Sequence, residues 1–562
     1  MSGTRLFAHT KWLVRWYIVP GTKKACTRRF TPSHPAKQQL VPGPCGIRRT
    51  VVAPLRSRTC LGRGCVNRFD ATWRVHAIVD FRVKVMRYAS RVSSSIRFRR
   101  VACARRWKLC CVSCAFFFIL LHLTSAWADA FLHLTSAWAD AFSYRSTNIL
   151  SIDFHISPVR DLKDLIARDP WLSRVHVIDE SLSGHCGTVH TCATNLRVLN
   201  QSNGITLGAC PNQLRKEFWD SYKEDSFLRN ISAFVCHHSL PLCEVYMGFP
   251  QPMILIASTR YEIGRYDAIS WEKLNRNLRA IISRPGNVLA ANNMYDAEYL
   301  KHFTCIDHVP VIPNICEYVE ATYKPKRFEY LIGPSRLSEG GKRVINGEGG
   351  LFDHLRRNAI SHSNFSTIRT LYGHYTYSDI ASHPGIILIP YQVSIMSLFE
   401  YYAMNIPLFV PSLDLLIKWQ LEHRIMDELS WNCVFGNCDS PSNIPGCGYS
   451  DHPYDPNDVT NPESLRHWLK FADFYQWPGI VYFDDWGDLL SKLDTTNLSY
   501  VTSVMKRHWL KEKQNASRFW KDFFRSASSA RHVGRRKVYK HTWETEVVKL
   551  YPQVPSASLL GC

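Results

Sequence analysis

The sequence predicts an α/β protein with two doubly wound parallel sheets in tandem. Two observations support this fold class. Short apolar runs alternate with helix-like segments over residues 147–325, and the same alternation begins again after the polar stretch ATYKPKR at 321–327. Strands that are apolar throughout lie inside parallel sheets, where helices cover both faces. We therefore expect one sheet on each side of a boundary near residues 323–328.

The expected elements follow from these runs. In the first half, the predicted strands are NILSIDFHI, ISAFVCHH, MILIAST and NVLAANN, and the predicted helices are DLKDLIARD and AISWEKLNRNLRAII. In the second half, the predicted strands are EYLIGPS, TIRTLYG, GIILIPY and IPLFVPS, and the predicted helices are MSLFEYYAMN and LDLLIKWQLEHR. After a loop rich in Gly, Pro, Asp and Asn, two aromatic helices should pack back onto the sheets: ESLRHWLKFADFYQW and SVMKRHWLKEKQNASRFWKDFF.

Positive charge is concentrated at the start of this 562-residue chain. The formal net charge is +22, but residues 1–128 hold 25 of the 69 Lys and Arg side chains and only two acids, Asp70 and Asp80. The remaining residues carry 44 basic and 45 acidic side chains. An enzyme that acts on nucleic acid needs a basic surface on its folded part, because phosphate neutralisation supplies most of the affinity. The charge distribution therefore argues against nucleic acid as a partner.

A stretch without formal charge, LCCVSCAFFFILLHLTSAWA at 109–128, follows the basic sequence RRWK. It is either a cleaved signal peptide that ends in Ala-Trp-Ala or a transmembrane signal anchor that just reaches bilayer length. Both alternatives send the rest of the chain into the secretory pathway, as a lumenal part on a Golgi or endoplasmic reticulum membrane or as a secreted protein. Residues 1–108 are a basic leader, expected to be disordered or absent from the mature product, and 129–146 form a linker with a duplicated LHLTSAWADAF.

Glycosylation sequons and cysteines also indicate the secretory pathway. Five Asn-x-Ser sequons lie at Asn200, Asn230, Asn364, Asn497 and Asn515. Beyond residue 128 we expect disulfides for the pair Cys186 and Cys192, the pair Cys236 and Cys243, and within the cluster Cys433, Cys438 and Cys447. One cysteine is left over, for which we expect Cys562. The weaker alternative is a zinc site without the usual CxxC spacing, at His185, Cys186, His190 and Cys192.

The first candidate site follows the first predicted strand. Ligands of doubly wound sheets bind outside the carboxyl ends of the strands, so residues that directly follow a strand are functional candidates. The stretch IDFHISP places Asp153 and His155 at this point, just before a helix. His155 is a candidate base or polar contact that faces the cleft between the two halves. The alternative is a buried histidine whose hydrogen bonds are satisfied by the backbone.

The second candidate site is the stretch LIGPSRLSEGGK, which opens the second half. A strand leads into a Gly-Pro turn, and Arg336 and Lys342 follow with five residues between them. Glycines permit close approach of the backbone, and two cations near a helix start suit a diphosphate. The alternative is a solvated basic loop.

Two further segments of the first half carry polar residues after strands. In STRYEIGR, Arg260 and Arg265 are candidates to line the cleft, and a structural ion pair with a neighbouring acid is the alternative. In AANNMYD, Asn292, Asn293 and Asp296 either hydrogen-bond hydroxyl groups of a ligand or cap the following helix, and helix capping is favoured.

The third candidate site is IILIPYQVSIMSLFEYYAMNIPLFVPS at 386–412, in which Glu400 is the sole acid. This stretch resembles the motif of B-fold glycosyltransferases, especially the retaining family related to glycogen and sucrose synthases. In that family two Glu residues have seven residues between them, and a Pro follows seven positions after the second Glu. Glu400 and Pro407 match the second Glu and the Pro, whereas Gln392 replaces the first Glu and Asn405 replaces a usual Gly.

The resemblance implies two Rossmann-like domains that face each other across a cleft, the second of which holds a nucleotide-sugar donor. Family members use the second Glu to accept hydrogen bonds from the donor's ribose hydroxyls, and the first Glu lies near the transferred sugar. They hold the donor diphosphate with an Arg and a Lys that have the spacing of Arg336 and Lys342. The implied donor-binding residues are therefore Arg336, Lys342, Gln392, Ser394, Ser397 and Glu400.

Together these features predict a glycosyltransferase of the secretory pathway with a glycan, protein or lipid acceptor. The acceptor domain is expected at 147–325, the nucleotide-sugar domain at 326–530 and a tail at 531–562. Cations and a helix N-terminus meet the diphosphate charge, so no metal or cofactor is expected besides the donor. Membrane contact is expected only through an uncleaved anchor. Inverting transfer with His155 or Asp153 as base and retaining transfer both stay open, and a catalytically inactive carbohydrate-binding or interaction protein is the alternative function.

Overall fold

The computed structural model describes residues 146–203, 211–261, 268–430, 433, 444–448 and 452–534. The predicted leader, the apolar stretch at 109–128, the duplicated LHLTSAWADAF and most of the tail lie outside these ranges. Within the described ranges, no helix is both long enough and apolar enough to cross a membrane.

The first sheet has five strands in the order β2-β1-β3-β4-β5, and each strand pairs with its neighbours in parallel. Its central strands are buried on both faces because their residues are almost entirely apolar. The strands are β1 (Thr147–Asp153), β2 (Val175–Ser181), β3 (Ala233–Cys236), β4 (Met253–Ala257) and β5 (Val288–Ala291).

The second sheet also has five parallel strands, in the order β10-β9-β8-β6-β7. When the strands of each sheet are counted along the chain, both sheets have the order 2-1-3-4-5, which is a doubly wound topology. The predicted pair of parallel α/β sheets is thus confirmed. The strands are β6 (Tyr330–Gly333), β7 (Phe365–Thr367), β8 (Ile386–Leu388), β9 (Leu408–Pro411) and β10 (Ile480–Phe483).

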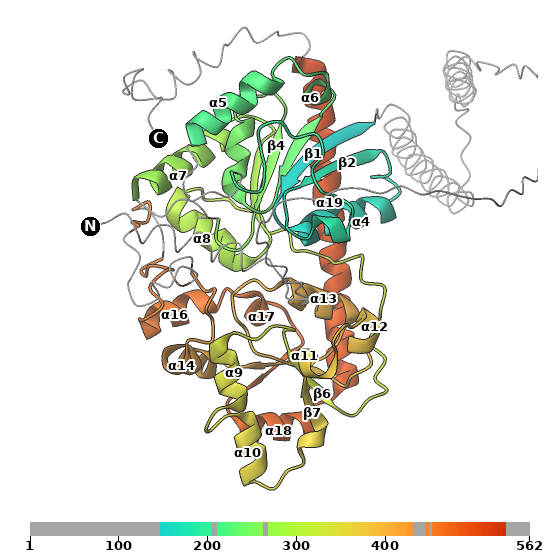
Figure 1. The fold of residues 1–562 in the computed structure, drawn as a ribbon, viewed down its shortest axis with the longest axis vertical. Coiled ribbons are helices and arrows are strands. Elements are labelled where there is room, and N and C mark those ends of the chain that lie inside the picture. The colour runs from blue at the N-terminus through green and yellow to red at the C-terminus, as the bar shows by residue number, and fades with distance from the viewer. Residues whose placement is uncertain are drawn as a thin grey trace, which may run out of the picture. The chain divides into compact units, whose positions relative to one another are not determined.

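Helices follow the strands along the chain in both halves of the fold (Figure 1). In the first half these are α4 (Ile156–Arg168), α5 (Pro211–Tyr222), α6 (Ser226–Arg229), α7 (Ala268–Ile282) and α8 (Met294–Thr304). In the second half they are α9 (Glu339–Asn346), α10 (Leu351–Arg357), α11 (Ile368–Leu371), α12 (Tyr377–Ile380), α13 (Met396–Met404), α14 (Leu413–His423), α16 (Pro462–Leu469), α17 (Asp473–Gln476), α18 (Trp486–Thr495) and α19 (Leu498–Gly534).

The long helix α19 joins the two halves (Figure 1). Near its start, the ring of His508 lies 5.9 Å from that of Tyr402 on α13, beside the second sheet. Further along, Trp520 and Phe524 belong to a buried cluster on the first sheet, together with Ile149, Val235 and Ile254. The last predicted helix therefore packs back onto a sheet as expected, but onto the sheet formed by the first half of the chain.

Some element predictions differ from the structure for local reasons. The predicted strand TIRTLYG is mostly helix, because the Thr367 side chain accepts a hydrogen bond from the amide of Thr370 and so caps α11. The predicted helix at 463–477 is two helices, α16 and α17. Strands β2 and β10 were not predicted. Strand β2, VHVIDES, lacks the continuous apolar run of the central strands, whereas β10, IVYF, is apolar and was missed despite its pattern.

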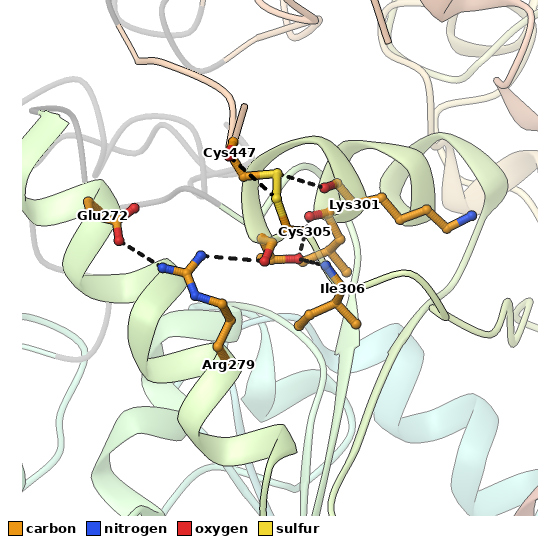
Figure 2. The surroundings of a disulfide bond; sticks show 8 residues. Glu272, Arg279, Lys301, Cys305, Ile306 and Cys447 are labelled. Carbon is orange, nitrogen blue, oxygen red and sulfur yellow. Dashed lines mark hydrogen bonds and ion pairs between the residues drawn. A yellow bond between two sulfur atoms is a disulfide. The ribbon is translucent and has the colours of Figure 1, made fainter. Parts of the chain in front are cut away.

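Disulfides link residues near and far along the chain. The predicted pairs Cys186–Cys192 and Cys236–Cys243 are confirmed. A third disulfide joins Cys305, just after α8, to Cys447, which lies 142 positions later. Figure 2 shows this bond beside α7, where Arg279 contacts both Glu272 and the carbonyl oxygen of Thr304 at the end of α8. Cys316 is a buried thiol, and Cys562 lies outside the described residues.

The long-range disulfide should stabilise the fold more than a short-range one, because it closes a longer loop in the unfolded chain. The chain-entropy relation gives about 5 kcal/mol for a loop of this length and about 2 kcal/mol for the Cys186–Cys192 loop. We predict that replacing Cys305 and Cys447 by Ser lowers the urea midpoint more than replacing Cys186 and Cys192. Equal losses, or a larger loss for the short loop, would contradict this account.

Asp473, the first residue of α17, is 1% exposed. Its Oδ2 has no hydrogen-bond partner among the described residues. Burial raises the pKa of Asp473 well above its usual range, and the buried Asp296 carboxyl raises this pKa further. A carboxyl with a raised pKa in the folded state costs stability once the pH exceeds its pKa in the unfolded chain, because only the unfolded chain then ionises it readily.

We therefore predict that Asp473→Asn increases the free energy of unfolding at neutral pH. The gain should shrink as the pH falls and vanish below about pH 4, where the unfolded Asp473 is also protonated. Urea unfolding at several pH values measures this difference, with the exposed Asp494→Asn as the matched control. A loss of stability at neutral pH, or a gain that does not depend on pH, would contradict the assignment.

Candidate functional site

The predicted site residues lie where each sheet reverses the direction in which strands are added. This point lies between β1 and β3 in the first sheet and between β6 and β8 in the second. Doubly wound proteins bind ligands at such points, outside the carboxyl ends of the strands. Asp153 ends β1, Arg336 follows β6 and Gln392 follows β8. The topology thus supports all three positions as candidates.

Asp153 connects the loops after β1 and β3. The side chain is fully buried, and its Oδ1 accepts a hydrogen bond of 2.7 Å from the His155 amide. Its Oδ2 accepts hydrogen bonds from the amides of His237 (3.3 Å) and His238 (3.0 Å). Burial raises the pKa of Asp153 to about 7, although the three amides lower it. The three amide hydrogen bonds give Asp153 a structural role.

His155 caps α4 with its side chain. Its Nδ1 accepts a hydrogen bond of 3.3 Å from the amide of Ser157. Burial, followed by the nearby His185, lowers the pKa of His155 to about 4, so the ring is neutral at pH 7. A neutral imidazole that accepts at Nδ1 carries its proton on Nε2. His155 therefore presents a hydrogen-bond donor at Nε2, and a base function would require loss of the cap.

Arg260 connects the two halves of the site. Its φ of 47° lies in the left-handed region, and Asp296 holds this turn by accepting hydrogen bonds from the amides of Thr259 (3.0 Å) and Arg260 (2.6 Å). The Arg260 side chain is 1% exposed. Its Nη1 donates to Gln392 Oε1 at 3.4 Å, and its Nη2 donates to the carbonyl oxygen of Glu428. Arg260 thus contacts Gln392, one of the predicted donor-binding residues.

Asn293 caps α8, as the sequence analysis favoured. Its Oδ1 accepts a hydrogen bond of 2.7 Å from the Asp296 amide, and its Nδ2 donates to Asp296 Oδ2 and Asn292 Oδ1. All three side chains are buried, so they support the Arg260 turn and are not exposed to a sugar. Arg265, the other predicted cleft cation, lies outside the described residues.

Arg336 and Lys342 are exposed on the loop after β6 and on α9. Ser338 caps this helix by accepting a hydrogen bond of 2.9 Å from the Gly341 amide, and Lys342 pairs with Glu339. A Cβ at Gly340 would clash with the backbone at the end of α14, so glycine allows α9 to approach that helix closely. The two predicted diphosphate cations therefore sit on a loop and helix that are fixed by close packing.

Two acids that no sequence pattern predicted interact electrostatically with these cations. Asp427 and Glu428 follow α14 and are partly buried. Burial raises the pKa of Asp427 to about 6, and Arg336 and Lys342 both lower it. Burial and then Asp427 raise the pKa of Glu428 to about 7, and Arg260 and Arg336 lower it. The acids follow no predicted strand, and only the fold brings them to the cations.

Glu400 lies in the second turn of α13, beyond the helix start, and is largely buried. Its Oε1 accepts two hydrogen bonds of 2.8 Å, from the hydroxyls of Tyr318 and Tyr377. Among the described residues, none donates to Oε2. Burial raises the pKa of Glu400, while the two hydroxyls and Arg160 lower it. One carboxylate oxygen is thus held in place and the other can accept from a ligand.

The two serines of the motif differ in position. Ser394 is buried and precedes α13, which begins at Met396. Ser397 is partly buried in the first turn of α13, one turn before Glu400.

No family model and no curated protein matches this chain. Solved structures show a loose likeness. The glycosyltransferase SnogD from Streptomyces nogalater has 12% identity and a TM-score of 0.33 over 67% of this chain and 100% of its own. The glycosyltransferase VinC, solved in complex with DTDP, has 8% identity and a TM-score of 0.33 over 68% and 100%. The glycotransferase of kitacinnamycin has 11% identity and a TM-score of 0.30 over 70% and 100%. Likeness at these TM-scores assigns no function.

The acids beside Arg336 should oppose the binding of an anionic ligand. We predict that Asp427→Asn tightens the binding of a nucleoside diphosphate about 5-fold at neutral pH, because it removes a negative charge that acts on Arg336 and Lys342. In the wild type, affinity should also rise as the pH falls from about 8 to about 6, since carboxyls with pKa values of about 6 and 7 take up protons over this range. Calorimetry with UDP, GDP and ADP measures both effects.

The matched control is Glu422→Gln, which removes an exposed acid of α14. The rise in affinity as the pH falls should be smaller in Asp427→Asn than in the wild type. Protonation of the nucleotide changes both affinities equally, so it drops out of this comparison. If Asp427→Asn binds the nucleotide more weakly than the wild type, or if Glu422→Gln gains as much affinity, the acids do not oppose binding in the way proposed.

Proposed function

We propose that this protein is a glycosyltransferase that moves a sugar from a nucleotide-sugar donor to a glycan, protein or lipid acceptor in the secretory pathway. The observation that carries this proposal is the position of the motif residues. Arg336, Lys342, Gln392 and Glu400 all follow the carboxyl ends of β6 and β8, which flank the point where the second sheet reverses its strand order.

Each motif residue suits one part of the donor. Arg336 and Lys342 provide cations for the diphosphate. Glu400 Oε2 accepts hydrogen bonds from the ribose hydroxyls, since its Oε1 is already occupied by Tyr318 and Tyr377. Gln392 lies beside the transferred sugar, and its contact with Arg260 ties this position to the acceptor side.

The geometry around His155 favours transfer without a side-chain base. In this proposal the acceptor hydroxyl oxygen bonds to the anomeric carbon as the bond between that carbon and the diphosphate oxygen breaks. The electron pair leaves with the diphosphate, and the leaving oxygen takes up the acceptor proton. Asp153 is occupied by three amides and His155 carries its proton on Nε2, so neither is poised to accept that proton.

Two features support the secretory pathway. The disulfides between Cys186 and Cys192, Cys236 and Cys243, and Cys305 and Cys447 suit an oxidising compartment. The sequon asparagines that are exposed to solvent, and thus open to glycosylation, are Asn200, Asn230, Asn364 and Asn497. Asn515 is partly buried on α19.

We predict that the full chain, produced in a eukaryotic host, releases nucleotide from one member of a panel of UDP-, GDP- and CMP-sugars. Glu400→Gln should raise the KM for that donor at least about 10-fold, because a hydrogen bond to a charged group contributes about 1.5–3 kcal/mol. Glu463→Gln, which changes an exposed acid on α16, is the control and should behave like the wild type.

The outcomes separate the two candidate functions. Turnover that depends on Glu400 supports the transferase. Nucleotide-sugar binding without turnover, across a panel of glycan, peptide and lipid acceptors, supports a catalytically inactive binding protein instead. If no nucleotide sugar binds, the assignment of the second sheet as a donor site is wrong.

A further inference from the structure

The segment 312–318 leaves the first sheet and ends at the candidate ribose-binding residue. Ile312 and Ile315 are buried in the first-sheet cluster that includes α4 and α19. Tyr318, at the other end of the segment, donates its hydroxyl to Glu400 Oε1 at 2.8 Å. We call residues 312–318 the crossover segment, because it is anchored on the first sheet and contacts a helix of the second.

Two elements hold the crossover segment in place. The buried Asp161 of α4 accepts hydrogen bonds from the amides of Ile315 (2.7 Å) and Glu317 (3.3 Å). On α19, Trp509 donates its indole N–H to the carbonyl oxygen of Ile315 at 2.9 Å, and Lys513 pairs with Glu317. The backbone before Tyr318 is therefore fixed from two sides, which limits where the Tyr318 hydroxyl can lie.

The ring of Tyr318 is held as well. Tyr318 is 7% exposed, and the Arg160 guanidinium lies over its ring with Cζ 4.5 Å from the centroid. A cation on a ring face is attracted by the ring quadrupole. Tyr377, on α12 of the second half, donates to the same carboxylate oxygen from another direction. Two hydroxyls from different parts of the fold thus meet at Glu400 Oε1.

We propose that Tyr318 is a positioning residue that orients the Glu400 carboxylate toward the ribose of the donor, so that the first sheet takes part in donor recognition. This inference rests on the proposed function. Two donors on Oε1 fix the carboxylate plane and leave Oε2 as the acceptor for a ribose hydroxyl. A carboxylate held this way makes a better hydrogen bond to the ribose, because little rotational freedom is lost when the ligand binds.

The test measures the ribose contact itself. Kd values are determined by calorimetry for UDP, GDP and ADP and for the 2′-deoxy counterpart of whichever binds best. In the wild type, the ribonucleotide should bind about 10-fold more tightly than its deoxy counterpart, and Glu400→Gln should lose most of this preference. Tyr318→Phe removes only the hydroxyl, and should lower the preference to about 3-fold or less without changing the affinity for the deoxynucleotide.

Tyr323→Phe is the matched control. Its hydroxyl donates to the carbonyl oxygen of Pro384 at 2.9 Å, so this variant also removes a tyrosine hydroxyl near the crossover segment without touching Glu400. It should keep the wild-type preference. Asp161→Asn provides a second variant if Tyr318→Phe does not fold: it loosens the crossover segment without altering Tyr318, and should lower the preference in the same direction.

The results distinguish this inference from the proposed function. If the wild type prefers the ribonucleotide and Glu400→Gln loses the preference, while Tyr318→Phe and Asp161→Asn keep it, Tyr318 does not position Glu400. A change that affects ribo- and deoxynucleotide equally in Tyr318→Phe would likewise show a merely structural role. If the wild type binds no nucleotide, the proposed function fails, and this inference fails with it.

Discussion

The pairing order of the two sheets is the constraint on which the rest of the structure depends. In each sheet the chain adds its second strand on one side of the first and its third strand on the other. The loops after the first and third strands are therefore neighbours, although long stretches of chain separate them. Asp153 shows the consequence in the first sheet, where one buried carboxylate holds the backbone after β1 and after β3 together. The candidate chemistry depends on such pairs of loops.

The site is built as much from acids as from cations. Asp296 holds the turn of Arg260, and Asp427 and Glu428 interact electrostatically with Arg336. Buried carboxyls are costly unless they accept hydrogen bonds or face a cation, and here most of them hold backbone amides or face an arginine. Arg260 is consequently fixed in place before any ligand arrives, whereas Arg336 and Lys342 are exposed and have part of their charge already balanced by neighbouring acids. The affinity for an anionic ligand then depends on the difference between its attraction to the cations and its repulsion by the acids.

Much of the fold could be predicted because it rests on local apolar patterns. The central strands are continuous apolar runs, and the disulfides Cys186–Cys192 and Cys236–Cys243 join cysteines close in sequence. Edge strand β2 was missed because its sequence VHVIDES has no continuous apolar run, and no local pattern indicates on which of the two sheets α19 packs. The motif residues were predicted from their spacing along the chain, which identifies their positions but not the side chains that contact them in the fold. Tyr318 lies 82 positions before Glu400, and only the crossover of the chain brings the two together.

The most direct test of the central claim is a crystal structure of the protein with a nucleoside diphosphate. The account predicts that the diphosphate lies against Arg336 and Lys342, and that a ribose hydroxyl is within hydrogen-bond distance of Glu400 Oε2 while Tyr318 still donates to Oε1. A nucleotide bound elsewhere, or one whose ribose points away from Glu400, would contradict the account.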